Sequence, residues 1–171
     1  MKNLRDMTYA EMLDEVLRLG EKPYRAIQMY AWVYRRRVAD IDSMTDISKT
    51  FRERMKEEFC IAPDKVVAVS ESVDGTRKFL TELSDSSRIE SVLIPEADRL
   101  TLCVSTQAGC AMACRFCMTG ADGFIRNLTL SEMSGHVFSA FGLLKDDERI
   151  TNIVLMGMGE PLNNYDNVIR F

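Results

Sequence analysis

The segment TQAGCAMACRFCMTG gathers three of the chain's five cysteines, Cys110, Cys114 and Cys117, within eight positions. In a reducing compartment, closely spaced thiols more often bind a metal or take part in chemistry than form disulfides. A structural zinc site has four closed ligands, usually in two separated pairs, whereas three thiolates on one loop suit three irons of a cubane cluster. The spacing CxxxCxxC therefore predicts a loop that holds a 4Fe-4S cluster and leaves the fourth iron open to a substrate or cofactor.

A zinc knuckle that borrows Cys103 as its fourth ligand is the alternative for these cysteines. Its spacing differs from the paired pattern of structural zinc sites. The metal bound after anaerobic purification separates the two interpretations, because the knuckle requires zinc and no iron.

The composition limits the classes of protein to consider. The chain has 171 residues, of which 46% are hydrophobic and 28% charged, so it can bury a hydrophobic core. This length suits one domain, or one domain and part of a second. Its net charge of -4 argues against coating nucleic acid through bulk positive charge, although a local basic patch stays open. The N-terminus lacks the apolar core of a signal peptide, and no stretch approaches the roughly 20 apolar residues of a membrane span. We therefore expect a cytoplasmic protein with no membrane partner.

The first third of the sequence predicts helices. Thr8 and Glu11 have capping-box spacing ahead of an apolar run that Gly20 ends. A second helical segment follows Pro23, and a third is expected over about 44–59. Residues 1–62 are therefore predicted to form a small helical domain.

The pattern then changes to strands. The runs VVAVSESV and TRKFLTEL flank Asp74-Gly75, a dipeptide favoured in tight hairpin turns, and a further strand, IESVLIP, ends at Pro95. Residues 63–95 are thus expected to form a connecting β segment.

Residues 96–171 predict a βαβ unit of a parallel sheet. LTLCVST is a short strand, the cysteine loop follows, Thr129 and Glu132 open a helix to about Leu144, and ITNIVLMG is a second strand that stops at GMGEP. Enzymes with parallel sheets build their sites at the C-terminal ends of the strands. We therefore expect the cysteine loop and GMGEP to face one pocket.

The pair of motifs resembles the radical S-adenosylmethionine enzymes. CxxxCxxC, with Phe116 between the last two cysteines as a possible shield, is similar to their cluster signature, and Gly159 and Glu160 of GMGEP match their Gly-Gly-Glu-type motif. The resemblance implies S-adenosylmethionine as cofactor, held at the open iron and by this motif through its amino group. It also implies that an electron from the cluster splits the cofactor to a 5′-deoxyadenosyl radical.

Longer stretches resemble one family within that superfamily, the radical adenine C2-methyltransferases of 23S ribosomal RNA and tRNA (the RlmN/Cfr family). The similar stretches are YRAIQMYAWVY, MTDISKTFRERM, IESVLIP, LCVSTQAGC, GFIRNLT and VLMGMGEPLNNYDNV. The resemblance implies an α/β fold: an N-terminal helical accessory domain that binds RNA, a small β segment, and the first βαβ portion of a partial (βα)6 barrel. Since such a barrel needs roughly 30 residues per unit, we expect the chain to be the N-terminal half of an enzyme that is active only at full length.

The resemblance also assigns catalytic roles. Adenine C2 is electron-poor and cannot attack an electrophilic methyl group, so a radical route is needed. In the family, a C-terminal methylated cysteine is bonded to C2, and a second cysteine releases the crosslink. Cys103 matches that resolving cysteine and Glu90 matches the proposed proton acceptor. Without the resemblance, the interpretations are a buried strand residue for Cys103 and a solvated carboxylate for Glu90.

The same resemblance implies partners and further chemistry. These are 23S rRNA and tRNA, an electron donor such as flavodoxin or ferredoxin, a monomeric state, and a disulfide bond whose partners are not assigned. Two alternatives remain open: another radical S-adenosylmethionine enzyme, and a non-catalytic RNA-binding module that holds a metal cluster.

Residues 20–40 combine arginines with aromatic residues, a mixture that suits RNA phosphates and stacked bases. Four residues at helical spacing are expected to pack in the core, namely Ile27, Tyr30, Ala31 and Tyr34. The arginines of this segment are predicted to contact RNA. Cys60 and His136 are interpreted as structural residues.

Overall fold

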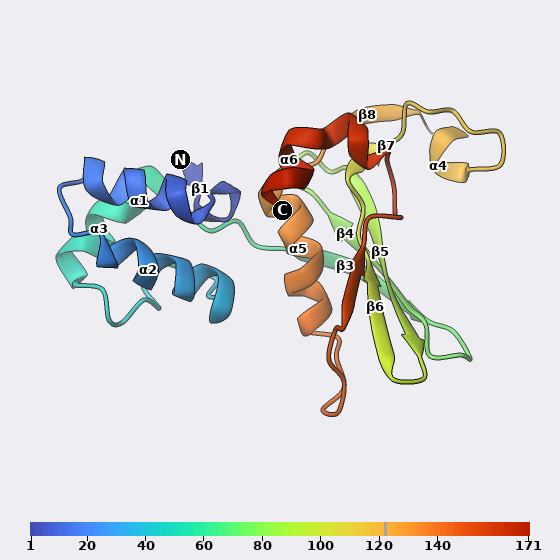
Figure 1. Cartoon of the computed structure of the whole chain (residues 1–171), viewed down its shortest axis with the longest axis horizontal. Helices are drawn as coiled ribbons and strands as arrows, with labels where there is room; N and C mark the ends of the chain where they lie inside the picture. The colour runs from blue at the N-terminus through green and yellow to red at the C-terminus, as the bar shows by residue number, and fades with distance from the viewer. Residues whose placement is uncertain (122) are drawn as a thin grey trace. The chain divides into compact units, whose positions relative to one another are not determined.

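The computed structural model describes residues 1–121 and 123–171. It divides into two compact units, Met1–Pro63 and Asp64–Phe171. Figure 1 shows helices dominating the first unit and a sheet dominating the second. The mixed α/β class expected from the sequence is confirmed.

The first unit is built from three helices and a two-stranded parallel pair, β1 with β2. Its elements are β1 (Lys2–Asn3), α1 (Tyr9–Arg18), α2 (Tyr24–Tyr30), α3 (Lys49–Glu58) and β2 (Phe59–Cys60), with a 3-10 turn at Leu4–Asp6 and a π-helical turn at Ala31–Arg35.

The predicted capping box at the start of α1 is confirmed. The Thr8 hydroxyl accepts from the Glu11 N–H, and the Glu11 carboxylate accepts from the Thr8 N–H. The third helix is shorter than expected and begins at Lys49. Ser48 has an extended backbone and caps the helix by accepting from the Phe51 N–H, so the residues before it cannot continue the helix.

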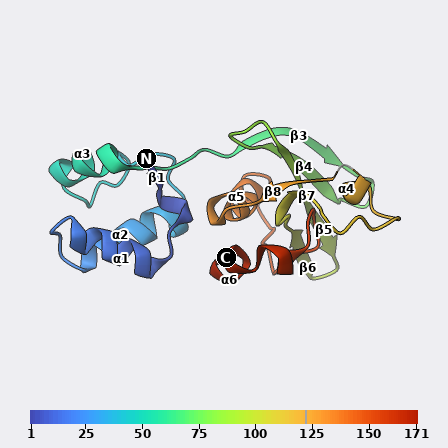
Figure 2. The ribbon, with the colours of Figure 1, turned by 90° about the horizontal axis from the view of Figure 1, so that it is seen from above.

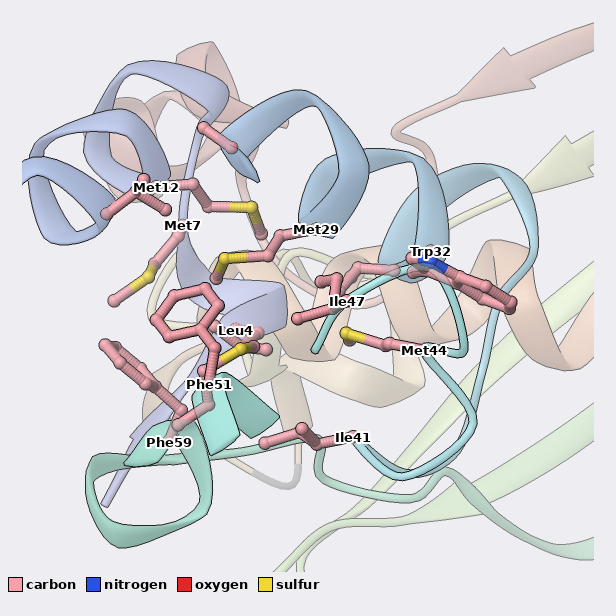
Figure 3. Close-up of a cluster of buried hydrophobic side chains, with 14 residues drawn as sticks. Leu4, Met7, Met12, Met29, Trp32, Ile41, Met44, Ile47, Phe51 and Phe59 are labelled. Carbon is pink, nitrogen blue, oxygen red and sulfur yellow. The ribbon is translucent and has the colours of Figure 1, made fainter. Parts of the chain in front are cut away.

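Fourteen buried side chains form the core of this unit, and several of them are methionines (Figure 3). The face of α2 differs from the prediction. Ile27 is 59% exposed, whereas Ala26 and Met29 are buried, followed by Trp32 and Val33. The predicted stripe is confirmed only in part, since Tyr30 and Tyr34 pack half-buried against the core whereas Ile27 is exposed. After α2 the chain continues as a π-helical turn, in which the Arg36 N–H donates to the Ala31 carbonyl.

The second unit contains a five-stranded sheet in the order β3-β4-β5-β6-β9. All its pairs are antiparallel except β6 with β9, which is parallel. The elements are β3 (Lys65–Glu71), β4 (Arg77–Glu82), β5 (Arg88–Glu96), β6 (Arg99–Cys103), β7 (Gln107–Gly109), α4 (Met118–Ala121), β8 (Phe124–Asn127), α5 (Leu130–Phe141), β9 (Asn152–Val154), a 3-10 turn (Pro161–Asn164) and α6 (Tyr165–Arg170).

The hairpin predicted around Asp74-Gly75 is confirmed by the antiparallel pairing of β3 with β4. Gly75 has φ +82°, the left-handed conformation that such turns require and that glycine adopts freely. Lys65–Glu71 is exposed along its whole length as the edge strand.

The predicted βαβ unit is also confirmed, since α5 connects β6 to its parallel neighbour β9 and covers one face of the sheet (Figure 2). Ala140 of α5 packs in a core with Phe79, Leu93 and Leu102 from three strands. The helix ends at Phe141, before the predicted Leu144. Within the described residues, no helix has the length and apolar character of a bilayer span.

Candidate functional site at the ends of two parallel strands

The GMGEP loop lies against residues 104–107, the segment that leads from β6 into the cysteine loop. The N–H groups of Thr106 and Gln107 both donate to the Met158 carbonyl, at 2.8 and 3.2 Å. The Gly157 N–H donates to the Val104 carbonyl at 3.2 Å. The GMGEP loop is therefore bonded to the segment that leads into the cysteine loop.

Two glycines permit this close approach. A Cβ on Gly157 would lie 2.7 Å from the Ser105 hydroxyl, and a Cβ on Gly159 would lie 2.6 Å from the Gln107 Cβ. Gly159 also has φ +99°. Since other residues rarely adopt this conformation, and no real Cβ fits at these distances, the loop requires glycine at both positions.

Glu160 lies at the start of the 3-10 turn. Its N–H donates to the Gln107 side-chain oxygen at 2.9 Å, and its carboxylate accepts from the Leu162 N–H at 3.1 Å through one oxygen. The side chain is half-buried. A carboxylate held next to a glycine backbone suits recognition of an ammonium group.

The cysteine loop separates its three thiols by burial. Cys110 is buried, Cys114 is exposed and Cys117 is half-buried. The Cys117 N–H donates to the Cys114 carbonyl at 3.0 Å, and Ala113 has a left-handed backbone, φ +48°. Among residues 1–121 and 123–171, no three cysteine, histidine or acidic side chains lie close enough together to hold a metal ion. The described loop therefore presents the predicted thiols without assembling them.

The Cys117 thiol has a lowered pKa, mainly because the Gly120 N–H donates to it and to a smaller extent because the Thr119 N–H does. This favours the thiolate, which is the form that binds metal. The neighbouring Phe116, expected to shield a cluster, is 92% exposed.

Glu90 and Cys103 share the face of the sheet that α5 does not cover. Ser91 of β5 contacts His136 of α5, so its neighbour Glu90 points to the opposite face. Val92, two residues after Glu90, is paired with Cys103. Glu90 and Cys103 are therefore diagonal neighbours on one face.

Their surroundings differ. Burial raises the pKa of the Cys103 thiol, which the Met156 N–H partly offsets by donating to it. The carboxylate of Glu90 is paired with Lys78 at 2.9 Å, and both side chains are about half exposed. Cys103 is thus a buried, protonated thiol that is hydrogen-bonded to Met156, the residue before the GMGEP loop. Glu90, in contrast, is an accessible carboxylate.

The sequence analysis missed Ser105. Its hydroxyl donates to the Glu90 carbonyl at 2.7 Å and accepts from the Met158 N–H at 2.9 Å. It therefore connects β5 to the GMGEP loop. A serine in a short strand gives no sequence signal for such a role.

Cys60 and His136 were interpreted as structural. His136 is buried, its Nδ1 is hydrogen-bonded to the Ser91 hydroxyl, and burial lowers its pKa to about 3, so the imidazole is neutral. Cys60 lies half-buried in β2 of the first unit. All five cysteines, which lie within the described residues, have free thiols, so none supplies the disulfide bond implied by the family resemblance.

The basic segment of the first unit is partly at the surface. Arg35, Arg36 and Arg37 are exposed. The Arg36 guanidinium stacks 3.9 Å from the ring centroid of Trp32, and Trp32 itself donates to Asp46. An arginine stacked on an anchored indole is held in place, which suits contact with phosphate or a base.

Comparison with known proteins shows which family this chain is similar to. Residues 2–61 match the model of the ribosomal RNA large subunit methyltransferase N-terminal domain. The chain is 52% identical to the dual-specificity RNA methyltransferase RlmN of Desulfosudis oleivorans, over 98% of this chain and 45% of that protein. It is 46% identical to the probable dual-specificity RNA methyltransferase RlmN of Thermotoga maritima, over 99% of this chain and 49% of that protein.

The fold is similar to the crystal structure of a radical SAM methyltransferase from Sphaerobacter thermophilus. The TM-score is 0.88 at 40% sequence identity, and the match covers 99% of this chain and 50% of that one. The chain spans about half the length of the curated relatives that it matches.

Proposed function

This chain belongs to the RlmN family of radical S-adenosylmethionine RNA methyltransferases, and we propose that it forms the part of an enzyme that methylates C2 of adenine in 23S rRNA and tRNA. The proposal extends to a methyl-cysteine intermediate, in which a methylated cysteine elsewhere in the complete protein delivers the carbon. The observation that carries the proposal is the bonded contact between the GMGEP loop and the strand that enters the cysteine loop.

Cys110, Cys114 and Cys117 would hold a 4Fe-4S cluster. The donor set fits in kind and number, because one loop offers three thiols and the backbone already favours the thiolate at Cys117. Exposed Cys114 has to approach buried Cys110 when the site is filled, as is usual for metal sites that form on binding. With S-adenosylmethionine bound, the cluster would supply the one-electron cleavage that generates a carbon radical.

Gly159 and Glu160 would bind the amino group of S-adenosylmethionine. The bond that the Glu160 N–H donates to the Gln107 side-chain oxygen fixes the backbone of Glu160, so its carboxylate starts from a defined position. The left-handed Gly159 brings the loop backbone close to the site without a side chain in the way.

Glu90 and Cys103 would act after carbon has bonded to adenine. Glu90 would accept the proton that leaves C2, and its exposure on the open face of the sheet supports that role. Cys103 would release the protein–RNA crosslink by attack of its thiolate on the methyl-carrying sulfur: a disulfide forms, the carbon–sulfur bond breaks, and the released carbon keeps the electron pair and takes up a proton to become the methyl group. Because burial raises the pKa of this thiol, it needs a base or a conformational change to become a nucleophile.

Residues 1–62 would bind RNA as the accessory domain. The exposed Arg35, Arg36 and Arg37 are the candidate contacts, since arginines neutralise phosphates and stack on bases. We also propose a cytoplasmic, monomeric enzyme reduced by a flavodoxin or ferredoxin. Five free thiols support a reducing compartment.

The test is the identity of the methylated product. The complete protein, purified and reconstituted without oxygen, is given 23S rRNA or tRNA with labelled S-adenosylmethionine, and the RNA is digested to nucleosides for mass spectrometry. We expect 2-methyladenosine, and we expect neither product nor iron after changing Cys114 to Ala. Methyl groups at another position would favour a different radical enzyme, and zinc without iron would favour a non-catalytic module.

A further inference from the structure

Gln107 is buried, with 1% of its surface exposed, and both ends of its side-chain amide are bonded. We propose that Gln107 is a positioning residue that fixes Glu160 relative to the cysteine loop, and thereby sets the affinity for S-adenosylmethionine. This inference rests on the proposed function of Glu160 and adds a residue that acts through it.

Three hydrogen bonds run in one direction through two side-chain amides. The Glu160 N–H donates to Gln107 Oε1 at 2.9 Å, Gln107 Nε2 donates to Asn127 Oδ1 at 2.7 Å, and Asn127 Nδ2 donates to the Asn163 carbonyl at 3.1 Å. The two ends are a backbone N–H, which can only donate, and a backbone carbonyl, which can only accept. The orientation of both amides is therefore determined by the backbone of one turn.

This chain of bonds encloses the turn that carries Glu160. It begins at residue 160 and returns to residue 163, so the two amides hold both ends of the 3-10 turn Pro161–Asn164. Gly159 packs directly on the Gln107 side chain, where a Cβ would lie 2.6 Å from the Gln107 Cβ. Gln107 thus contacts the GMGEP loop through its side chain and its backbone.

The same residue belongs to the cysteine loop. Gln107 begins β7, pairs with Asn127 of β8, and lies three positions before Cys110. A displacement of Gln107 would move the start of the cysteine loop against Glu160. One amide therefore couples the predicted cluster ligands to the carboxylate predicted to bind the cofactor.

Removing the amide leaves two partly buried groups without their partner. In Gln107→Ala the Glu160 N–H and the Asn127 side-chain oxygen Oδ1 both lose a bond, and the turn is free to shift. Gln107→Glu is the sharper variant, because it keeps an acceptor for the Glu160 N–H but cannot donate to Asn127. Both variants keep all three cysteines.

The experiment measures cofactor binding in the complete protein with its reconstituted cluster. Iron content is determined first, then S-adenosylmethionine affinity by equilibrium dialysis, then the change that S-adenosylmethionine causes in the electron paramagnetic resonance spectrum of the reduced cluster. We expect Gln107→Ala and Gln107→Glu to retain full iron and to bind the cofactor about tenfold or more weakly. The spectral change should return at saturating cofactor.

Ser91→Ala is the matched control. It removes a buried hydrogen bond to His136 in the same unit, and that bond involves no residue of either loop. We expect its cofactor affinity to equal that of the wild type. Asn127→Ala provides a second variant of the chain of bonds if Gln107→Ala does not fold, and we expect a smaller loss of affinity from it.

A double-mutant cycle with Glu160→Ala separates this inference from the proposed function. If Gln107 acts through Glu160, Gln107→Ala should cost little affinity once Glu160 is absent. An equal cost in both backgrounds, or loss of iron in a folded Gln107 variant, would overturn the positioning role. An unchanged affinity in Glu160→Ala alone would instead remove Glu160 from the cofactor site and the proposed function with it.

Discussion

Arg77 of β4 and Glu148 in the loop after α5 form an ion pair although they stand 71 positions apart. Arg77 Nη2 donates to both carboxylate oxygens, at 2.8 and 2.7 Å, and Nη1 donates to the Leu143 carbonyl. Arg77 is buried and Glu148 is about one-fifth exposed. The pair joins the loop before β9 to β4, which is not a neighbour of β9 in the sheet order β3-β4-β5-β6-β9.

Loss of the carboxylate should destabilise the second unit. Glu148→Ala leaves a buried guanidinium without its counter-charge, and we expect the free energy of unfolding to fall by about 2–3 kcal/mol. Glu71→Ala, which removes the exposed pair with Lys145, should cost about 0.5 kcal/mol or less. Urea unfolding followed by circular dichroism measures both, and the fluorescence of Trp32 reports the other unit as an internal reference. Equal losses in the two variants would contradict the expectation.

The contribution of Glu148 should depend on pH. Burial by itself raises the pKa of this carboxyl, but bonds from the Lys145 N–H and Arg77 outweigh it and lower the pKa below the usual 4.5. The stabilisation is therefore complete above about 4.5 and is lost as the pH falls through the lower folded-state pKa. A gap between wild type and Glu148→Ala that stays the same at pH 3 would rule out this origin.

His136 should make folding sensitive to mild acid. Burial lowers its pKa from 6.5 to about 3, so the unfolded chain binds a proton over a range where the folded chain does not. Stability is therefore complete above pH 6.5 and decreases as the pH falls toward 3. Between pH 7 and 5 this loss should be about 2 kcal/mol in the wild type and absent in His136→Gln. Nuclear magnetic resonance of the single histidine checks the cause, since an imidazole that titrates near 6.5 in the folded protein would exclude it.

The cysteines should react with iodoacetamide in an order set by exposure and pKa. In the cluster-free protein we expect exposed Cys114 and low-pKa Cys117 to react first and buried Cys103 last. Mass spectrometry of timed digests gives each rate. Raising the pH should accelerate Cys103 most, because its thiolate is scarce. Reconstitution with iron and sulfide should protect Cys110, Cys114 and Cys117 together, and selective protection of one of them would contradict a shared cluster.

Cys103→Ala should separate the resolving cysteine from the cluster ligands. In the complete protein the variant is expected to keep its iron and cleave S-adenosylmethionine, because those steps need no thiol at this position. It should then hold RNA covalently, since release of the crosslink does need one. A denaturing gel after anaerobic turnover with labelled RNA detects the adduct. Free, normally methylated RNA without a shifted band would leave Cys103 as a packed strand residue.

Local signals in the sequence predicted much of the fold correctly. The capping box at Thr8 is confirmed, as is the one at Thr129, whose hydroxyl accepts from the Glu132 N–H. Asp74-Gly75 predicted its hairpin because the turn depends on the conformational freedom of those two residues. Each of these features is decided within a few neighbouring positions.

Features that depend on distant partners were not predictable in the same way. The exposure of Ile27 and the π-helical turn at Ala31–Arg35 were not indicated by any pattern of neighbouring residues. Gln107 and Ser105 act through bonds to residues about 50 positions later, which a single sequence does not reveal. The cysteines were recognisable by spacing, but their different burial and the left-handed backbone of Ala113 between them were not.

The contact between Gly159 and Gln107 restricts how the gene for this protein can evolve. Any codon other than glycine at position 159 adds a Cβ that collides with Gln107, in a backbone conformation with φ +99° that already disfavours it. Shortening Gln107 to Ala would not make room, because the Cβ and the backbone nitrogen of residue 107 would still lie 2.6 and 2.8 Å from the added Cβ, and it would remove the bond that holds Glu160. Part of the block at position 159 thus comes from the backbone itself, so a compensating change of the side chain at position 107 cannot open that codon to other residues.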